Sequence, residues 1–174
     1  GRQGIARMLN VRIQDDRVGH SKREWTSFHM IDDAMRETSD VNAVYRLILQ
    51  DLHELGVNRA DLYLLPDPVE FIGARSIALS DTLRPVGRLI GGSARAIEGT
   101  RTVALQDVLG RLVPRRGGCS AYTVGGIMAG NELLGIVAFE HGTLDADGQL
   151  IATLNLGIAL KHMQMIANER ESNE

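Results

Sequence analysis

Two apolar segments separated by a Gly-Asn pair constrain the fold of this chain more than any other feature. Residues 121–129 and 132–140 both have the apolar composition of strands, and Gly130-Asn131 lies between them. Glycine and asparagine tolerate the positive φ angles of a tight two-residue turn. The pattern therefore predicts an antiparallel hairpin over residues 121–140, and with it an antiparallel sheet.

A helix is predicted over residues 41–55, where apolar side chains recur at intervals of three and four. This spacing places them along one side of a helix. Asp40 precedes the stripe as an N-cap, because its carboxylate can accept the free amide hydrogens of the first turn. Gly56 follows as a left-handed C-cap. The stripe comprises Val41, Val44, Tyr45, Ile48, Leu49, Leu52 and Leu55.

The segments on either side of this helix predict further elements. A helix is expected over residues 24–38, and strands over 60–65 and 70–79. Proline interrupts a strand ladder and Asp favours a turn, so Pro66-Asp67-Pro68 should separate these two strands of a hairpin. Residues 80–99 return to helical spacing. Gly91-Gly92 interrupts that spacing, which favours two short helices there.

The last third of the chain predicts a long C-terminal helix. A short strand is expected over residues 100–105, a cationic loop over 106–118, and the helix from 149 to about 169. This helix is apolar on two sides, so both sides must be buried. One side can pack on the sheet. The other needs either a second subunit, which predicts a homodimer through terminal helices, or the helices at 24–38 and 41–55 of the same chain. The two stripes are Ile151, Leu154, Ile158 and Met165, and Leu156, Leu160 and Met163.

Composition fits one folded domain. The chain has 174 residues, of which 44% are hydrophobic and 24% charged, close to the average of globular proteins. No apolar run approaches the roughly 20 residues that cross a bilayer. We divide the chain into a basic connector helix or arm (1–24), one domain (25–170) and a tail (171–174). Because the chain begins with Gly1 and has no signal peptide, we interpret it as part of a longer protein.

Positive charge is concentrated in one region. The net charge of the whole chain is −3, yet eight of its arginines lie between Arg75 and Arg116. Residues 69–118 contain only four acidic residues, so this segment has a net charge of +4. Guanidinium groups offer a planar set of donors to carboxylates and phosphates. The segment therefore predicts a site for an anion, or alternatively a solvated cationic surface.

The order of elements and several segments of the sequence resemble the GAF domain family. The C-terminal block SAYTVGGIMAGNELLGIVAFEHGTLDADGQLIATLNLGIALKHMQMIANE matches that family as strand, Gly-Asn turn, strand with Gly135 after two leucines, and long apolar helix. The segments VNAVYRLILQDLHELGVNRADLYLL and RPVGRLIGGSARAIEGTRTVALQDVL are similar to its first helix-to-strand unit and to its helix before the third strand. The resemblance covers about residues 25–170.

The resemblance implies an α+β fold with a central antiparallel sheet of five to six strands. The N- and C-terminal helices would pack on one face, and short helices and loops of residues 80–118 would form a lid on the other. A small ligand would bind between sheet and lid. The resemblance therefore places the ligand where the arginines concentrate.

Six residues are candidates for contacting this ligand. Arg75 would lie in the strand 70–79, on the same side as Ile77 and Leu79. Arg84 and Arg88 would share one side of a helix, four residues apart. The other candidates are Arg101, Tyr122 and Cys119, and the arginines and glycines before Cys119 would favour its thiolate.

The single cysteine bears on catalysis. GAF proteins that reduce free methionine sulfoxide resolve the sulfenic acid with further cysteines, and bilin-binding members place a His after the cysteine. Here Cys119 is followed by Ser120, and it is the only cysteine. No histidines have the spacing of a metal site. The sequence therefore predicts neither an enzyme nor a metal protein, and leaves any cofactor undefined.

Three functions follow from these observations. The first is a regulatory domain that binds a small, anionic or amphiphilic ligand and transmits its state through the terminal helices of a dimer to covalently linked signalling domains. The second is a ligand-free dimerisation or spacer module. The third, which the cysteine count disfavours, is a sulfoxide reductase. We expect no nucleic acid contact and a cytoplasmic location, either free or as the cytoplasmic part of a membrane-anchored protein.

Overall fold

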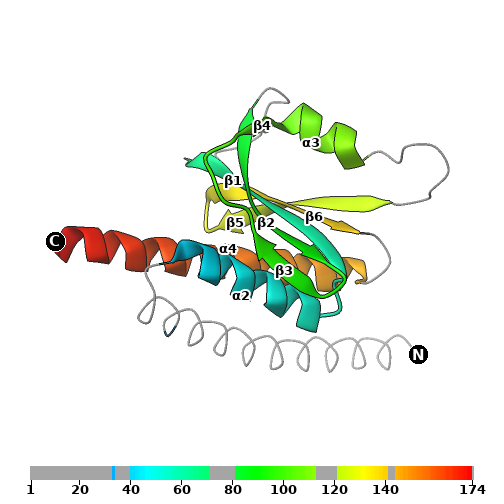
Figure 1. Ribbon diagram of the computed structural model, residues 1–174, viewed down its shortest axis with the longest axis horizontal. Coiled ribbons are helices and arrows are strands. Elements are labelled where there is room, and N and C mark those ends of the chain that lie inside the picture. Colours follow the sequence, from blue (N-terminus) through cyan, green and yellow to red (C-terminus); the bar gives the residue numbers. More distant parts are fainter. Residues whose placement is uncertain (1–32, 34–39, 71–80, 113–120, 141–143, 174) are drawn as a thin grey trace, which may run out of the picture.

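The computed structural model describes residues 33, 40–70, 81–112, 121–140 and 144–173. An antiparallel sheet has helices α2 and α4 on one face and helix α3 on the other (Figure 1). The expected α+β fold is therefore confirmed. The elements are α2 (Val41–Glu54), β1 (Arg59–Glu70), β2 (Thr82–Ile90), β3 (Ser93–Ala96), β4 (Val103–Ala104), α3 (Leu105–Leu112), β5 (Tyr122–Ala129), β6 (Glu132–Glu140) and α4 (Ala146–Asn173).

Helix α2 and the β5–β6 hairpin have the bounds that the sequence predicts. The Asp40 side chain accepts a hydrogen bond from the backbone N–H of Asn42 at 2.9 Å, and Gly56 has a φ of 102°. Strands β5 and β6 pair up to Ala129 and Glu132. Gly130 supplies a positive φ of 58° in the two-residue connection.

Strand β1 lies in the middle of the sheet, whose order is β3-β2-β1-β6-β5. Leu62 faces Gly87 of β2 on one side and Val137 of β6 on the other. The predicted hairpin of residues 60–65 with 70–79 is therefore wrong, because both edges of the first strand are already paired. Strand β1 also continues through the two prolines to Glu70, with an interruption of the β1–β6 register between Leu64 and Val69. The rest of the predicted second strand lies outside the described residues.

Residues 82–96 form a hairpin of strands β2 and β3, so the helices predicted over residues 80–99 are wrong. Gly91 and Gly92 have φ angles of 56° and 84° and connect the two strands. The β1–β2 register shifts between Leu62 and Tyr63, whose partners are Gly87 and Pro85. This bulge places Val86 and Leu89 on the same face of the sheet. They are three positions apart in the sequence, which is why this segment has helical spacing.

The segment after β3 crosses to the other face of the sheet. Strand β4 confirms two residues of the strand expected over 100–105, and it pairs with β2. Helix α3 follows directly, so the loop predicted over 106–118 is wrong for its first seven residues. Residues 113–120 lie outside the described residues.

Helices α2 and α4 bury a large apolar cluster against the sheet, in which Leu49, Leu62, Phe139 and Leu160 are almost fully enclosed. Gly157 allows α4 to approach β5 closely, because a Cβ there would collide with the backbone carbonyl of Met128. Helix α4 is long enough, and with a mean hydropathy of 1.3 apolar enough, to cross a membrane. The core helices of soluble proteins can have the same length and hydropathy. In this fold α4 packs on β5.

The two predicted stripes of the C-terminal helix have different surroundings. Leu156, Leu160 and Met163 are buried against the sheet. On the other stripe Leu154 and Met165 are 45% and 52% exposed. Helix α4 continues to Asn173, through most of the expected tail. The predicted arm and the helix at 24–38 lie outside the described residues, apart from Asp33.

Candidate functional site

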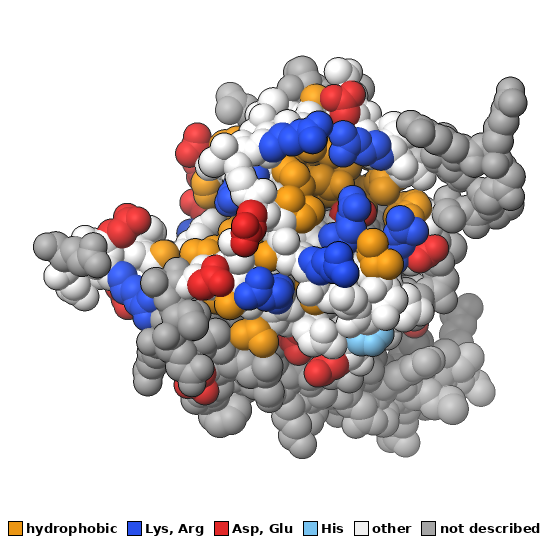
Figure 2. Space-filling view, viewed as in Figure 1, with side chains coloured by type: hydrophobic (Ala, Val, Ile, Leu, Met, Phe, Trp, Pro, Cys, Tyr) orange, Lys and Arg blue, Asp and Glu red, His pale blue; other side chains and the backbone are white. Residues whose placement is uncertain are grey.

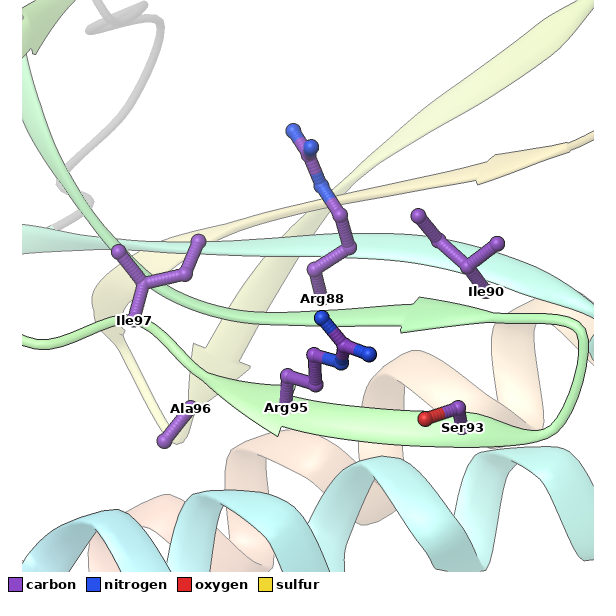
Figure 3. Close-up of a pocket in the computed structure, with 6 residues that line it drawn as sticks. All are labelled: Arg88, Ile90, Ser93, Arg95, Ala96 and Ile97. Carbon is purple, nitrogen blue, oxygen red and sulfur yellow. The ribbon is translucent and has the colours of Figure 1, made fainter.

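A row of three charged residues crosses strands β1, β2 and β3 on the face of the sheet opposite α2 and α4. The strand registers pair Asp61 with Arg88, and Arg88 with Arg95. Residues paired in this way point to the same face, with Cβ atoms about 4.5–5.5 Å apart. In the close-up, Arg88 and Arg95 both extend away from α2 (Figure 3).

Arg88 is held at the centre of this row by Asp61. Its Nε donates a hydrogen bond of 2.6 Å to Oδ1 of Asp61, which is only 7% exposed. This hydrogen bond raises the pKa of Arg88, so the guanidinium stays charged. Because Arg88 itself is half-exposed, part of its donor capacity faces solvent.

Tyr63 lies beside the row and is nearly buried. Burial raises the pKa of its phenol, and the negative charge of Asp61 raises it further, whereas Arg88 and Arg111 act in the opposite direction. Tyr63 is therefore a neutral donor at physiological pH. The influence of Arg111 places a guanidinium of α3 near the same face.

Arg95 is the exposed member of the row, and no ion pair holds it among the residues that the structure describes. Two like charges on directly opposed strand positions destabilise a sheet by up to about 1 kcal/mol. Asp61 compensates only one of the two arginines. The second therefore remains available to an anion from outside.

A hollow of about 430 Å³ lies over the β2–β3 hairpin. It is lined by Arg88, Ile90, Ser93, Arg95, Ala96 and Ile97 (Figure 3). In the space-filling view, several Lys and Arg side chains surround hydrophobic ones over the same part of the molecule (Figure 2). The hollow thus combines two guanidinium groups and a hydroxyl with apolar walls.

Among the residues that the structure describes, apolar side chains pack between the sheet and α3, where the sequence resemblance implies a pocket. Leu83, Val108 and Ile136 are at most 3% exposed and form a second apolar cluster with Tyr63, Val103 and Leu105. Residues 82–96 belong to the sheet, so the predicted lid of residues 80–118 is wrong for that part. The hollow lies over the β2–β3 hairpin, and no residue of α3 lines it.

Arg84 and Arg88 do not lie on the same side of an element, although the sequence predicts that both lie on one side of a helix. Arg84 is paired with Leu64, a residue of the cluster beneath α2 and α4. It contacts the buried phenol of Tyr45 in α2, whose pKa burial raises and Arg84 lowers. The bulge in the β1–β2 register places the two arginines on opposite faces. Arg84 is therefore not part of the hollow.

Two further predicted site residues, Arg101 and Tyr122, are described and do not line the hollow. Arg101 is exposed in the segment before β4. Tyr122, in β5, is three strands from Arg88, or roughly 14 Å at the usual strand spacing. Arg75 and Cys119 lie outside the described residues. Of the four candidates in the described part of the chain, only Arg88 lines the hollow.

The prediction missed Asp61 and Tyr63 as partners of Arg88. A carboxylate inside the apolar segment Ala60-Asp61-Leu62 was the available signal, because a charge at a buried strand position needs a partner. Among the described residues, no group of three or more His, Cys, Asp or Glu side chains could hold a metal ion.

Comparisons with known proteins give solved structures of low sequence identity. The GAF domain from Acinetobacter phosphoenolpyruvate-protein phosphotransferase is 7% identical over 83% of this chain and 97% of its own, with a TM-score of 0.45. The chromophore-binding domain of Stigmatella aurantiaca phytochrome P1 is 11% identical over 81% of this chain and 59% of its own, with a TM-score of 0.35. No family model and no curated protein matches the chain.

The described strands and helices form an α+β domain, with one sheet between two helical layers. The chain spans about three fifths of the phytochrome domain.

Proposed function

We propose that this chain is a regulatory domain that binds a small anionic ligand in the hollow over the β2–β3 hairpin. The observation that carries the proposal is the pair Arg88 and Arg95, adjacent on neighbouring strands and compensated by a single carboxylate. A ligand anion between them would relieve their repulsion and gain charge-assisted hydrogen bonds. The GAF-like fold supports a regulatory role.

We propose binding rather than catalysis at this site. The polar groups that line the hollow are two guanidiniums and the hydroxyl of Ser93. These groups donate hydrogen bonds, and the Asp61 carboxylate already accepts one from Arg88. The set suits recognition of an anion and lacks a free general base.

Transmission through a homodimer remains part of the proposal. Leu150, Leu154 and Met165 give α4 an apolar side with exposed fractions of 60%, 45% and 52%. A second copy of the same helix would bury this side.

Three further expectations remain predictions from the sequence. They are signalling domains linked to the chain, the absence of nucleic acid contact and a cytoplasmic location.

A ligand-free spacer is the second candidate, favoured by the apolar cluster that fills the space beneath α3. Thermal unfolding with a panel of small carboxylates and phosphate esters separates the two. Ligand at 100 times its Kd stabilises a protein by about 2.7 kcal/mol. We expect at least one anion to raise Tm in the wild type and in Arg46→Gln, a variant on α2, and to have no effect on Arg95→Gln. If no anion raises Tm, the spacer is the better account.

A further inference from the structure

We infer that the ligand of the hollow is a monocarboxylic acid with a compact apolar body, an inference that rests on the proposed binding site. Charge, wall chemistry and size all bear on this assignment. Each follows from residues that line the hollow or contact its lining.

The charge of the site matches a single negative charge. Two guanidiniums line the hollow, and Asp61 compensates the one on Arg88 at 2.6 Å. Among the described residues that line the hollow, one positive charge is left. A dianion would bring its second charge close to the buried Asp61 carboxylate, which repels it.

The free donors also suit a carboxylate. Arg88 uses its Nε for Asp61, so it can offer a ligand only its terminal amino groups. Among the described residues no ion pair engages the planar edge of the Arg95 guanidinium. Two parallel N–H groups of one guanidinium match the two oxygens of a carboxylate. The geometry assigns Arg95 as the principal anchor and Arg88 as the second contact.

The remaining walls are apolar. Ile90 is 48% exposed on the same face, and Ile97 and Ala96 continue the lining. An aliphatic side chain that is half-exposed in the free protein loses contact with water when an apolar ligand covers it, and this burial contributes to binding. A volume of about 430 Å³ lies near the lower end of small-molecule sites, so the body must be compact.

Calorimetric titration with four probes tests this assignment on the whole chain. Benzoate has one charge and a ring, phenyl phosphate has the same ring on a phosphate, inorganic phosphate has no ring, and methyl benzoate has no charge. We expect benzoate to bind at least tenfold more tightly than either phosphate, and methyl benzoate to give no measurable heat of binding. Phenyl phosphate binding as tightly as benzoate, or more tightly, would overturn the carboxylate assignment and leave the anion site in place.

Three variants locate the binding. Arg95→Gln should weaken benzoate at least tenfold, and Ile97→Ser several-fold, because one removes the anchor and the other part of the wall. Arg46→Gln makes the same change of charge on α2 and should leave the affinity unchanged. Circular dichroism checks that each variant is folded. Unchanged benzoate affinity in Arg95→Gln would overturn the assignment, and the absence of binding by every anion would overturn the proposed function itself.

Discussion

Gly157 and Gly110 are both helical glycines, but their surroundings differ. A Cβ at Gly157 would collide with the carbonyl of Met128, whereas nothing lies within 4 Å of a Cβ at Gly110. Alanine is preferred over glycine in helices by roughly 1 kcal/mol. The same substitution should therefore have opposite effects at the two positions.

We predict that Gly157→Ala lowers the free energy of unfolding by about 1–3 kcal/mol, because α4 must move away from β5. Gly110→Ala should raise the free energy by up to about 1 kcal/mol. Urea denaturation of both variants measures the difference. Equal effects at the two positions would contradict the close contact between α4 and β5.

Tyr63 makes stability depend on pH in the alkaline range. Burial raises its pKa above the ordinary value of 10.0, so the unfolded chain loses the phenolic proton at a lower pH than the folded protein. Stability should therefore be complete below about pH 10 and fall as pH rises further. We predict a smaller fall in Tyr63→Phe, measured by urea denaturation from about pH 8 to about pH 11. Tyr45, whose pKa burial also raises, should account for part of the remainder.

The sequence places both arginines of the site in the cationic segment, but only Arg88 is among the six candidates, and the grouping of the two could not be predicted. Local charge identified residues 69–118, and both Arg88 and Arg95 lie there. Which arginines share a face depends on strand register, and one bulge moves Arg84 to the opposite face. Asp61 lies 27 residues before Arg88 in the sequence, and it becomes a neighbour of Arg88 only because β1 pairs with β2.

At the scale of elements, the β2–β3 hairpin determines the shape of the site. Gly91 and Gly92 allow the tight turn that brings Arg88 and Arg95 together. Both glycines have φ angles that β-branched residues rarely adopt. A substitution that the turn cannot accept should therefore affect the site as well as stability.

We predict that Gly91→Val destabilises the protein by about 1–2 kcal/mol, whereas Gly91→Asn is tolerated, because asparagine adopts positive φ more readily. No atom lies within 4 Å of a Cβ at this position, so the difference reports on the backbone alone. Urea denaturation measures it. Equal stability of the two variants would argue against a turn with positive φ at Gly91.

Elements whose ends are marked by capping or turn residues could be predicted from the sequence. Elements whose geometry depends on pairing with a distant strand could not. Helix α2 has a cap at each end, and the β5–β6 hairpin has a Gly-Asn turn between two apolar segments. Strand β2 gives no such signal. Its bulge, which depends on pairing with β1, places Val86 and Leu89 on one face although they are three positions apart, a spacing typical of a helix.

At the scale of the whole molecule, helix α4 has an apolar side that is exposed to solvent in a single chain. Burial of an apolar side chain contributes roughly 1.5–3 kcal/mol, so a second copy that covers Leu150 and Leu154 would be stabilised. We predict a dimer by light scattering, and a monomer for Leu154→Asp. Gln50→Asp, at an exposed position on α2, is the control and should remain dimeric. A wild-type monomer at all concentrations would contradict the proposed homodimer.

The central claim for the molecule is that its ligand binds over the β2–β3 hairpin and not beneath α3. Backbone amide shifts in a nuclear magnetic resonance titration with benzoate test this claim directly. We predict that the largest shifts fall within residues 88–97, while the amides of Val103, Leu105 and Val108, in the cluster that fills the space below α3, change little. Shifts concentrated on that cluster, or none within residues 88–97 at saturating benzoate, would contradict the account.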